Sequence, residues 1–126
     1  MRKRSLARWR SSGLSDAKRA WSLETARAML AEVRSCTERA VKEVDPLEAE
    51  RESLAGTPEG AEVEARLRGA VSRWIREMEA LGVTVKGLWL VDFDNGGGCY
   101  CWRWPEEKLE FYHGQDEGYD DRVRIQ

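Results

Sequence analysis

Residues 21–47, WSLETARAMLAEVRSCTERAVKEVDPL, decide the fold of this chain, because apolar residues recur in them at steps of three and four. That spacing places the apolar side chains on one face of an α-helix over roughly seven turns. Ser22 is the predicted N-cap, since its hydroxyl can accept a backbone N–H of the first turn. Pro46 lacks an N–H and crowds the preceding turn, so we expect a kink or break near Asp45 and a short resumption through Leu54.

A second amphipathic helix follows a short loop. Thr57 is its predicted N-cap, Pro58 takes the first helical position, and Gly82 supplies the left-handed residue after the last turn. Two long helices joined by a short loop pack as an antiparallel hairpin. A hairpin alone covers each apolar stripe only in part, so the rest of the chain must cover the remainder.

The C-terminal third predicts a small antiparallel sheet. Its β-prone runs are Val83–Val85, Leu88–Phe93, Cys99–Trp104 and Leu109–His113. We therefore expect an α+β fold, in which an N-terminal antiparallel two-helix hairpin packs against a C-terminal sheet of three to four strands. The predicted parts are a basic arm (1–20) and one α+β domain (21–126), with the hairpin at 22–82 and the sheet region at 83–126. Alternation in the tail allows an added edge strand through Ile125.

A turn at Pro105–Lys108 would fix the register of the last hairpin. It predicts these cross-strand pairs: Trp104 with Leu109, Arg103 with Glu110, Trp102 with Phe111, Cys101 with Tyr112, and Tyr100 with His113. The face predicted to join the core carries Tyr100, Trp102, Trp104, Leu109, Phe111 and His113. The opposite face carries Cys99, Cys101, Arg103, Glu110 and Tyr112.

Charge and cysteine content restrict the class of protein. The 126 residues carry a net charge of −2, so the whole chain is not an evident nucleic-acid binder. Residues 1–21 hold seven basic residues against one acidic residue, and residues 105–121 hold seven acidic residues against one lysine. Three cysteines fit reduced thiols better than a disulfide framework. With no apolar run long enough for a transmembrane helix and no signal peptide, we expect a cytoplasmic protein without membrane association.

The cysteines at positions 99 and 101 invite a metal hypothesis, which the predicted register disfavours. Side chains two apart on a strand lie about 7 Å from each other, an awkward separation for one tetrahedral zinc. The same register places His113 on the opposite face. The sequence therefore predicts neither a metal nor a cofactor.

Three residues remain candidates for catalysis: His113, Asp92 and Cys101. His113 would need a partner, either Tyr100 across the strand or a carboxylate from Asp116, Glu117 or Asp120. Asp92 is expected to face away from its apolar neighbours and to pair with Lys86, Arg103 or Arg122. Each of these side chains also has a purely structural interpretation. The candidate binding residues are Arg103, Tyr112, Tyr119 and Arg122.

The order of motifs from Trp21 onward resembles a family of small, mostly bacterial proteins catalogued as domain of unknown function 2203. The motifs are Trp21-Ser22-Leu23-Glu24-Thr25-Ala26, Gly82-Val83-Thr84-Val85-Lys86, Leu90-Val91-Asp92-Phe93, Cys101-Trp102-Arg103, Tyr112-His113, Gly118-Tyr119 and Arg122. The sequence departs from the family pattern at Trp89, Asp94 and Pro105, where Gly, Pro and Gly are usual. The resemblance covers about residues 21–125. It implies a fold and candidate positions but no activity.

The leading functional hypothesis is a non-enzymatic interaction or scaffold module that works through the hairpin and the charged termini. A homodimer, in which the hairpins form a four-helix arrangement, and a separate protein partner are both compatible with it. The first alternative is a small enzyme or a ligand- or metal-binding protein that uses Asp92, Cys101, His113 and Arg122. The second alternative is nucleic-acid binding through residues 1–20.

Overall fold

The computed structural model describes residues 20–126, so the predicted basic arm lies outside the described residues except for its last position. Two helices, α1 (Leu23–Ser53) and α2 (Pro58–Leu81), form an antiparallel hairpin. Five strands follow: β1 (Thr84–Gly87), β2 (Leu90–Asp94), β3 (Gly98–Arg103), β4 (Phe111–Gly114) and β5 (Val123–Arg124). They form one antiparallel sheet in the order β1-β2-β3-β4-β5, and a 3₁₀ turn at Tyr119–Asp121 precedes β5.

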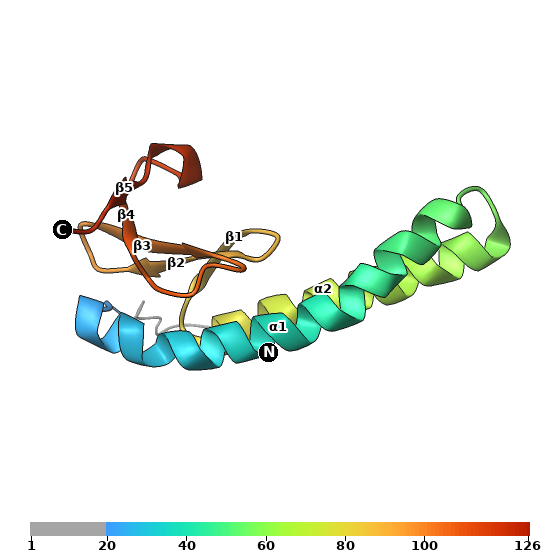
Figure 1. Cartoon of the computed structure of the whole chain (residues 1–126), viewed down its shortest axis with the longest axis horizontal. Coiled ribbons are helices and arrows are strands. Elements are labelled where there is room, and N and C mark those ends of the chain that lie inside the picture. Colours follow the sequence, from blue (N-terminus) through green and yellow to red (C-terminus); the bar gives the residue numbers. More distant parts are fainter. Residues whose placement is uncertain (1–19) are drawn as a thin grey trace, which may run out of the picture.

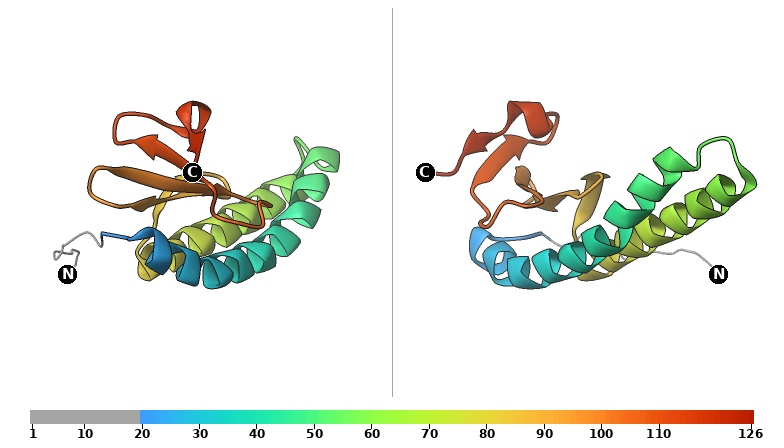
Figure 2. Two further views of the ribbon diagram at one scale, coloured as in Figure 1. Left: turned by 60° about the vertical axis from the view of Figure 1, so that its left-hand side comes forward. Right: turned by 45° about the vertical axis from the view of Figure 1, so that its right-hand side comes forward.

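The α+β class and the helical hairpin are confirmed. The sheet has five strands rather than the predicted three to four, because the tail pairs with β4 as an edge strand. Figure 1 shows the sheet over one half of the hairpin only, formed by the beginning of α1 and the end of α2. The other half projects beyond the sheet, and both views of Figure 2 agree on this.

The ends of both helices follow from their sequence. The Ser22 hydroxyl accepts a hydrogen bond from Thr25 N at 3.0 Å, and the Thr25 hydroxyl accepts one from Ser22 N at 3.0 Å. This reciprocal capping box satisfies two backbone N–H groups that have no partner within the helix. Thr57 caps α2 through Gly60 N at 3.0 Å. Gly82 ends α2 with φ 91°, a conformation that a residue with a side chain rarely adopts.

Helix α1 is not broken at Pro46, so the predicted break is wrong. Pro46 removes only one backbone hydrogen bond of a long helix. Val44 and Leu47, on either side of it, are 1% and 9% exposed and pack in the seam with α2. Burial on both sides holds the helix together where local propensity disfavours it.

Two apolar clusters make up the core. The larger cluster lies between the sheet and the near half of the hairpin, and its largest fully buried members are Trp74, Trp102, Phe93 and Met78. The smaller cluster seals the seam of the projecting half with Val44, Leu47, Val63, Leu67 and Ala70. The hairpin therefore buries most of its own distal stripe, and Trp89 of the β1–β2 turn also packs against this cluster.

The predicted register between β3 and β4 is wrong by one residue. Cys101 pairs with Phe111, Tyr100 with Tyr112, and Cys99 with His113. A four-residue turn does not join these strands. Residues 104–110 connect them instead, held by bonds from the Trp102 indole N–H to Glu106 O at 2.8 Å and from Glu106 N to Arg103 O at 2.8 Å.

A shift of one residue moves every side chain of a strand to the other face of the sheet. Phe111 and His113 therefore lie on the face of Cys99 and Cys101, and Tyr112 joins Tyr100, with ring centroids 5.7 Å apart. The predicted Arg103–Glu110 pair does not form, and Glu110 bonds to Arg124 at 3.0 Å. The predicted assignment of β3 to its two faces holds, and that of β4 is inverted.

Two glycines of α2 provide a matched test of the hairpin loop. A Cβ added to Gly60 would lie 2.2 Å from the carbonyl oxygen of Leu54, whereas one added to Gly69 would meet nothing within 4 Å. We expect Gly60→Ala to lower the free energy of unfolding by about 2 kcal/mol through backbone displacement. Gly69→Ala should raise it by up to about 1 kcal/mol, because alanine favours the helix. Urea unfolding of both variants measures the two changes in the free energy of unfolding. Equal changes would contradict the close approach of the Leu54 carbonyl to Gly60.

Candidate functional site

The chemistry-bearing residues gather on the face of the sheet turned away from the helices, which we call the outer face. Asp92 in β2 lies opposite Cys101 in β3, and Cys99 lies opposite His113 in β4. The alternating residues Val91, Phe93 and Trp102 point to the helices. Strand periodicity thus brings one carboxylate, two thiols and one imidazole together. All four are buried, with exposed fractions of 6% or less.

His113 is held on both sides of its ring. Its Nδ1 lies 2.8 Å from the carbonyl oxygen of Gly114, and its Nε2 lies 3.0 Å from Oδ2 of Asp92. A carbonyl oxygen only accepts, so Nδ1 carries a proton and the orientation of the ring is fixed. The predicted partners of His113 are wrong: Tyr100 points to the other face, and Glu117 accepts instead from Gly114 N at 2.7 Å.

Asp92 faces His113, so the predicted pairing with Lys86, Arg103 or Arg122 is wrong. Although Oδ2 is close to the imidazole, neither carboxylate oxygen accepts a well-aligned hydrogen bond from any residue of 20–126. Asp92 is 1% exposed. A buried carboxylate is tolerated only with partners close by, and the groups close to Asp92 are the imidazole of His113 and the thiols of Cys99 and Cys101.

The two thiols are protonated at neutral pH. Burial and, to a smaller extent, the nearby Asp92 carboxylate together raise the pKa of Cys99 to about 11. Burial also raises the pKa of Cys101 to about 12, with Asp92 again adding to the effect. Because the thiolate is the nucleophile, these shifts argue against Cys101 as a free attacking group. No disulfide forms, and Cys36 lies apart in the hairpin seam.

Arg122 closes the outer face beside Cys101. Its guanidinium lies 4.0 Å from the ring centroid of Phe111 and 4.1 Å from that of Tyr119. Both of its terminal nitrogens contact the Glu106 carboxylate, and Nη1 lies 3.9 Å from Sγ of Cys101. A bidentate pair enclosed by two rings is a rigid arrangement. It holds the tail over the sheet.

The predicted site residues thus divide into three sets. Asp92, Cys101 and His113 lie together on the outer face of the sheet. Arg103, Tyr119 and Arg122 form a neighbouring group, with the Arg103 guanidinium 5.5 Å from the Tyr119 ring. Tyr112 lies on the opposite face. The sequence prediction left out Glu106, which lies three residues after Arg103 of the Cys-Trp-Arg motif. It set Cys99 aside for two reasons, the separation between Cys99 and Cys101 and the wrong register.

The arrangement can do two things chemically. It can share one proton between Asp92 and His113 as a buried pair, or it can hold a cation. Ligand atoms of Asp92, Cys99 and His113 all lie within 4.8 Å of one another. Contact with a substrate would require the tail to move, because the residues are buried.

Comparison with known proteins identifies the family and goes no further. The model of the family described as uncharacterized conserved protein (DUF2203) matches residues 19–125, so the chain belongs to that family. No curated protein and no solved structure matches the chain. Within residues 20–126, neither helix has the length and apolar character needed to cross a membrane.

Proposed function

We propose that this protein is a non-enzymatic interaction module that self-associates through the projecting half of its hairpin. In this proposal, the basic residues 1–19 of one copy bind the acidic end of the hairpin of another copy. The supporting observation is the charge of residues 43–64, which we call the acidic tip. It holds eight acidic residues and one arginine, whereas the whole chain has a net charge of only −2.

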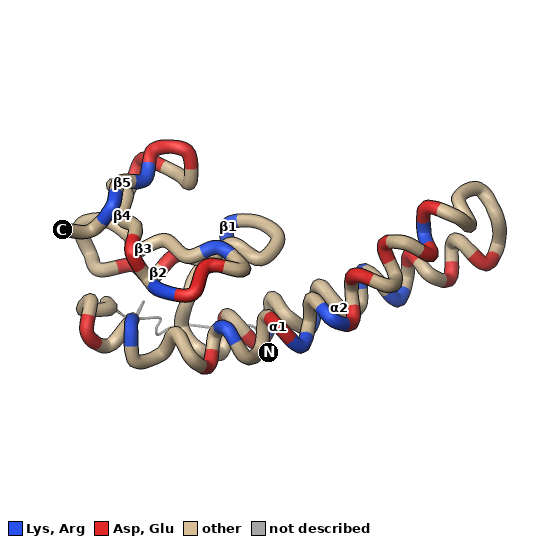
Figure 3. The backbone as a smooth tube through the Cα atoms, in the orientation of Figure 1, with Lys and Arg blue, Asp and Glu red and all other residues tan. Residues whose placement is uncertain are grey.

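The acidic tip is a stable structural element in its own right. Its seam is sealed by the smaller apolar cluster, and ion pairs join the two helices: Arg73 with Glu43 at 2.8 Å, Arg66 with Glu50 at 3.5 Å, and Arg51 with Glu64 at 3.7 Å. Figure 3 shows acidic residues predominating at the free end of the hairpin. An element that the sheet does not need for its own core is available for contact with a partner.

Several acidic side chains of the tip are unpaired. Asp45, Glu52, Glu59 and Glu62 are exposed and form no ion pair with any residue of 20–126. Residues 1–19 carry seven basic residues against one acidic residue, a nearly equal and opposite charge. Complementary charge of this kind directs association and makes it sensitive to salt.

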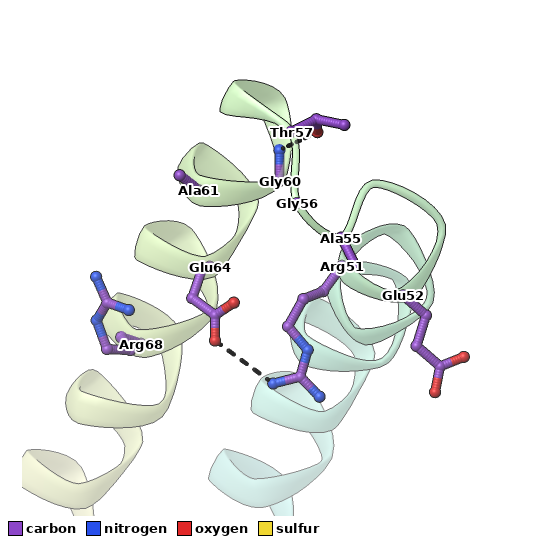
Figure 4. A pocket seen from close by; sticks show the side chains of 9 residues that line it. All are labelled: Arg51, Glu52, Ala55, Gly56, Thr57, Gly60, Ala61, Glu64 and Arg68. Atoms are coloured by element: carbon purple, nitrogen blue, oxygen red, sulfur yellow. Dashed lines mark hydrogen bonds and ion pairs between the residues drawn. The ribbon is translucent and has the colours of Figure 1, made fainter.

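A hollow of about 690 Å³ lies at the free end, between the last turn of α1, the loop and the first turns of α2. Figure 4 shows Glu64 directed across the gap toward Arg51, with Gly56 and Gly60 on the loop side. Arg68 also lines the hollow, and Glu52 is directed away from the gap. The charge of the acidic tip as a whole, and not this hollow, therefore supports the proposal.

The burial of Asp92, Cys101 and His113 supports a non-enzymatic protein over the small-enzyme alternative. A catalytic group must reach its substrate, and these side chains are 3% exposed or less. The nucleic-acid alternative uses the same basic residues, 1–19, and the experiment below separates it from self-association.

The test is the mass of the full chain in solution, measured by sedimentation at two salt concentrations. At about 50 mM salt the charge interactions are weakly screened, and at about 500 mM they are strongly screened. We expect an oligomer at low salt that dissociates at high salt. Glu52→Lys with Glu62→Lys should weaken association by about 10-fold or more, since each exposed charge pair contributes up to about 1 kcal/mol. Deletion of residues 2–19 should abolish association.

The matched control makes the same charge change elsewhere. Asp116→Lys with Asp120→Lys reverses two exposed acidic residues of the C-terminal segment. This double variant should associate at least as well as the unmodified chain. A monomer at low salt, or equal weakening by both double variants, would refute the proposal.

A further inference from the structure

We infer that Asp92, Cys99 and His113 form a binding site for a transition-metal ion, with zinc as the first candidate. The site lies on the outer face of the sheet and takes one ligand from each of β2, β3 and β4. Its ligand atoms are a carboxylate oxygen, Sγ of Cys99 and Nε2 of His113, all within 4.8 Å of one another. This inference goes beyond the proposed interaction function and does not depend on it.

The first argument comes from the histidine ring. Metal-binding histidines usually donate their other ring N–H to a carbonyl or carboxylate, which fixes the tautomer and leaves one lone pair for the ion. His113 has this arrangement, because its Nδ1 lies 2.8 Å from Gly114 O. The other ring nitrogen, Nε2, faces Asp92 Oδ2 at 3.0 Å. At that distance a proton or a cation lies between the two atoms, and a metal ion bound there would take the place of the proton.

The second argument is independent and comes from Asp92. Its carboxylate is 1% exposed and faces the His113 imidazole at 3.0 Å and the thiols of Cys99 and Cys101, although neither oxygen accepts a well-aligned hydrogen bond from residues 20–126. Buried charges in proteins are paired or coordinate metals. A cation bound by Asp92 and His113 satisfies the carboxylate and the Nε2 lone pair together.

The third argument is the chemistry of the ligand set. One imidazole, one thiolate and one carboxylate suit zinc and related first-row metals, whereas calcium and magnesium prefer oxygen ligands throughout. Zinc binds such ligands at about 2.0–2.3 Å, so three ligand atoms around one ion lie roughly 3–4 Å apart. Small side-chain movements bring the present atoms to that spacing. Cys101 lies outside the set of three and beside Arg122.

The position of the site suggests what the ion does. The helices cover only the inner face of the sheet, so the outer face lacks a large apolar layer of its own (Figure 1). A metal bound by residues of three neighbouring strands would link those strands and stabilise that face of the sheet. All three ligands are buried, but structural zinc normally has four protein ligands, so the fourth tetrahedral position here would be left for water or another donor.

The experiment measures zinc and cobalt binding to the purified full chain after treatment with a chelator. We expect one ion per chain, measured by competition with a coloured chelator. Cobalt should give the visible absorption of a tetrahedral site and a near-ultraviolet thiolate band. Zinc should also raise the melting temperature, because a ligand bound only by the folded state stabilises it.

Conservative variants identify the ligands. Asp92→Asn and Cys99→Ser should each weaken zinc binding by at least about 100-fold, because changes in the outer shell alone cost about 10–100-fold. Cys99→Ser should also remove the thiolate band of the cobalt protein. The control is Cys36→Ser, which alters a buried thiol of the hairpin and should leave binding unchanged. Far-ultraviolet circular dichroism verifies that each variant is folded.

Two results would overturn the inference. Absence of stoichiometric zinc or cobalt binding by the folded chain would leave Asp92 and His113 as a proton-sharing pair. Loss of binding in Cys101→Ser, with binding intact in Cys99→Ser, would show that the assigned ligand set is wrong. Neither result bears on association through the acidic tip, which is measured separately.

Discussion

Trp102→Ala is expected to lower the free energy of unfolding by about 3–5 kcal/mol, the range for removal of a large aromatic side chain from a packed core. Trp102 is fully buried and lies opposite Val91 in the centre of the inner face. Its indole N–H also donates to Glu106 O at 2.8 Å and so helps to shape the 104–110 connection. The variant therefore loses apolar contacts and one of two hydrogen bonds to this carbonyl, the other being donated by Arg34 Nε at 3.0 Å. Urea unfolding followed by circular dichroism measures the change.

Trp104→Ala is the matched control, because it removes the same side chain two residues along the chain. Trp104 is only partly buried and stacks beneath the Arg34 guanidinium at 5.3 Å. We expect it to cost less than half as much. If Trp102→Ala does not fold, Trp102→Phe keeps most of the volume and tests the indole hydrogen bond alone, with an expected loss of about 1–2 kcal/mol. Equal losses for Trp102→Ala and Trp104→Ala would mean that the inner face of the sheet is not the centre of the core.

His113→Ala is expected to lower the free energy of unfolding by about 3–5 kcal/mol, by a different mechanism. The substitution leaves Asp92 as a buried carboxylate without its partner, and removal of one member of a buried pair is far more costly than replacement of both. His113 and Asp92 are 3% and 1% exposed, so water cannot take the place of the imidazole without opening the tail. The measurement is again urea unfolding, with metal-free protein used throughout.

Asp92→Asn separates charge from packing at the same place. An asparagine amide can donate to Nε2 of His113, the nitrogen that faces the carboxylate at 3.0 Å, and it carries no charge. We expect this variant to lose no more than about 1 kcal/mol. If Asp92→Asn is as damaging as His113→Ala, the unpartnered charge is not the reason for the instability. A folded Asp92→Asn protein is also the variant that the metal-binding experiment needs.

The hairpin could be predicted from the sequence because its determinants are local. A helical stripe, an N-cap hydroxyl and a C-terminal glycine act within a few residues of one another, and the structure confirms Ser22, Thr57 and Gly82 in these roles. Pro46 shows the limit of such reasoning. Its local effect is to break a helix, but the burial of Val44 and Leu47 against α2 is a long-range contact that outweighs it.

The candidate site could be predicted only in part, for a similar reason. The alternation along β2 correctly predicts that the Asp92 side chain lies on the opposite face from Val91 and Phe93, because the direction of side chains within a strand is a local property. The partner of Asp92 depended on the register between β3 and β4. That register was set by the 104–110 connection, which is also held by long-range bonds that the sequence does not display, from Arg34 to Glu106 O and from Arg27 to Leu109 O.

The sequence by itself determined the class of fold, the two helices with their caps, and the faces of β2 and β3, because periodicity and capping are short-range. Only the tertiary structure decided that His113 faces Asp92 and Cys99. A sheet register is fixed by the length and packing of its connections, and a one-residue shift moves every side chain of the strand to the other face. The burial and the missing donors that make Asp92 a candidate metal ligand are likewise properties of the assembled sheet and tail.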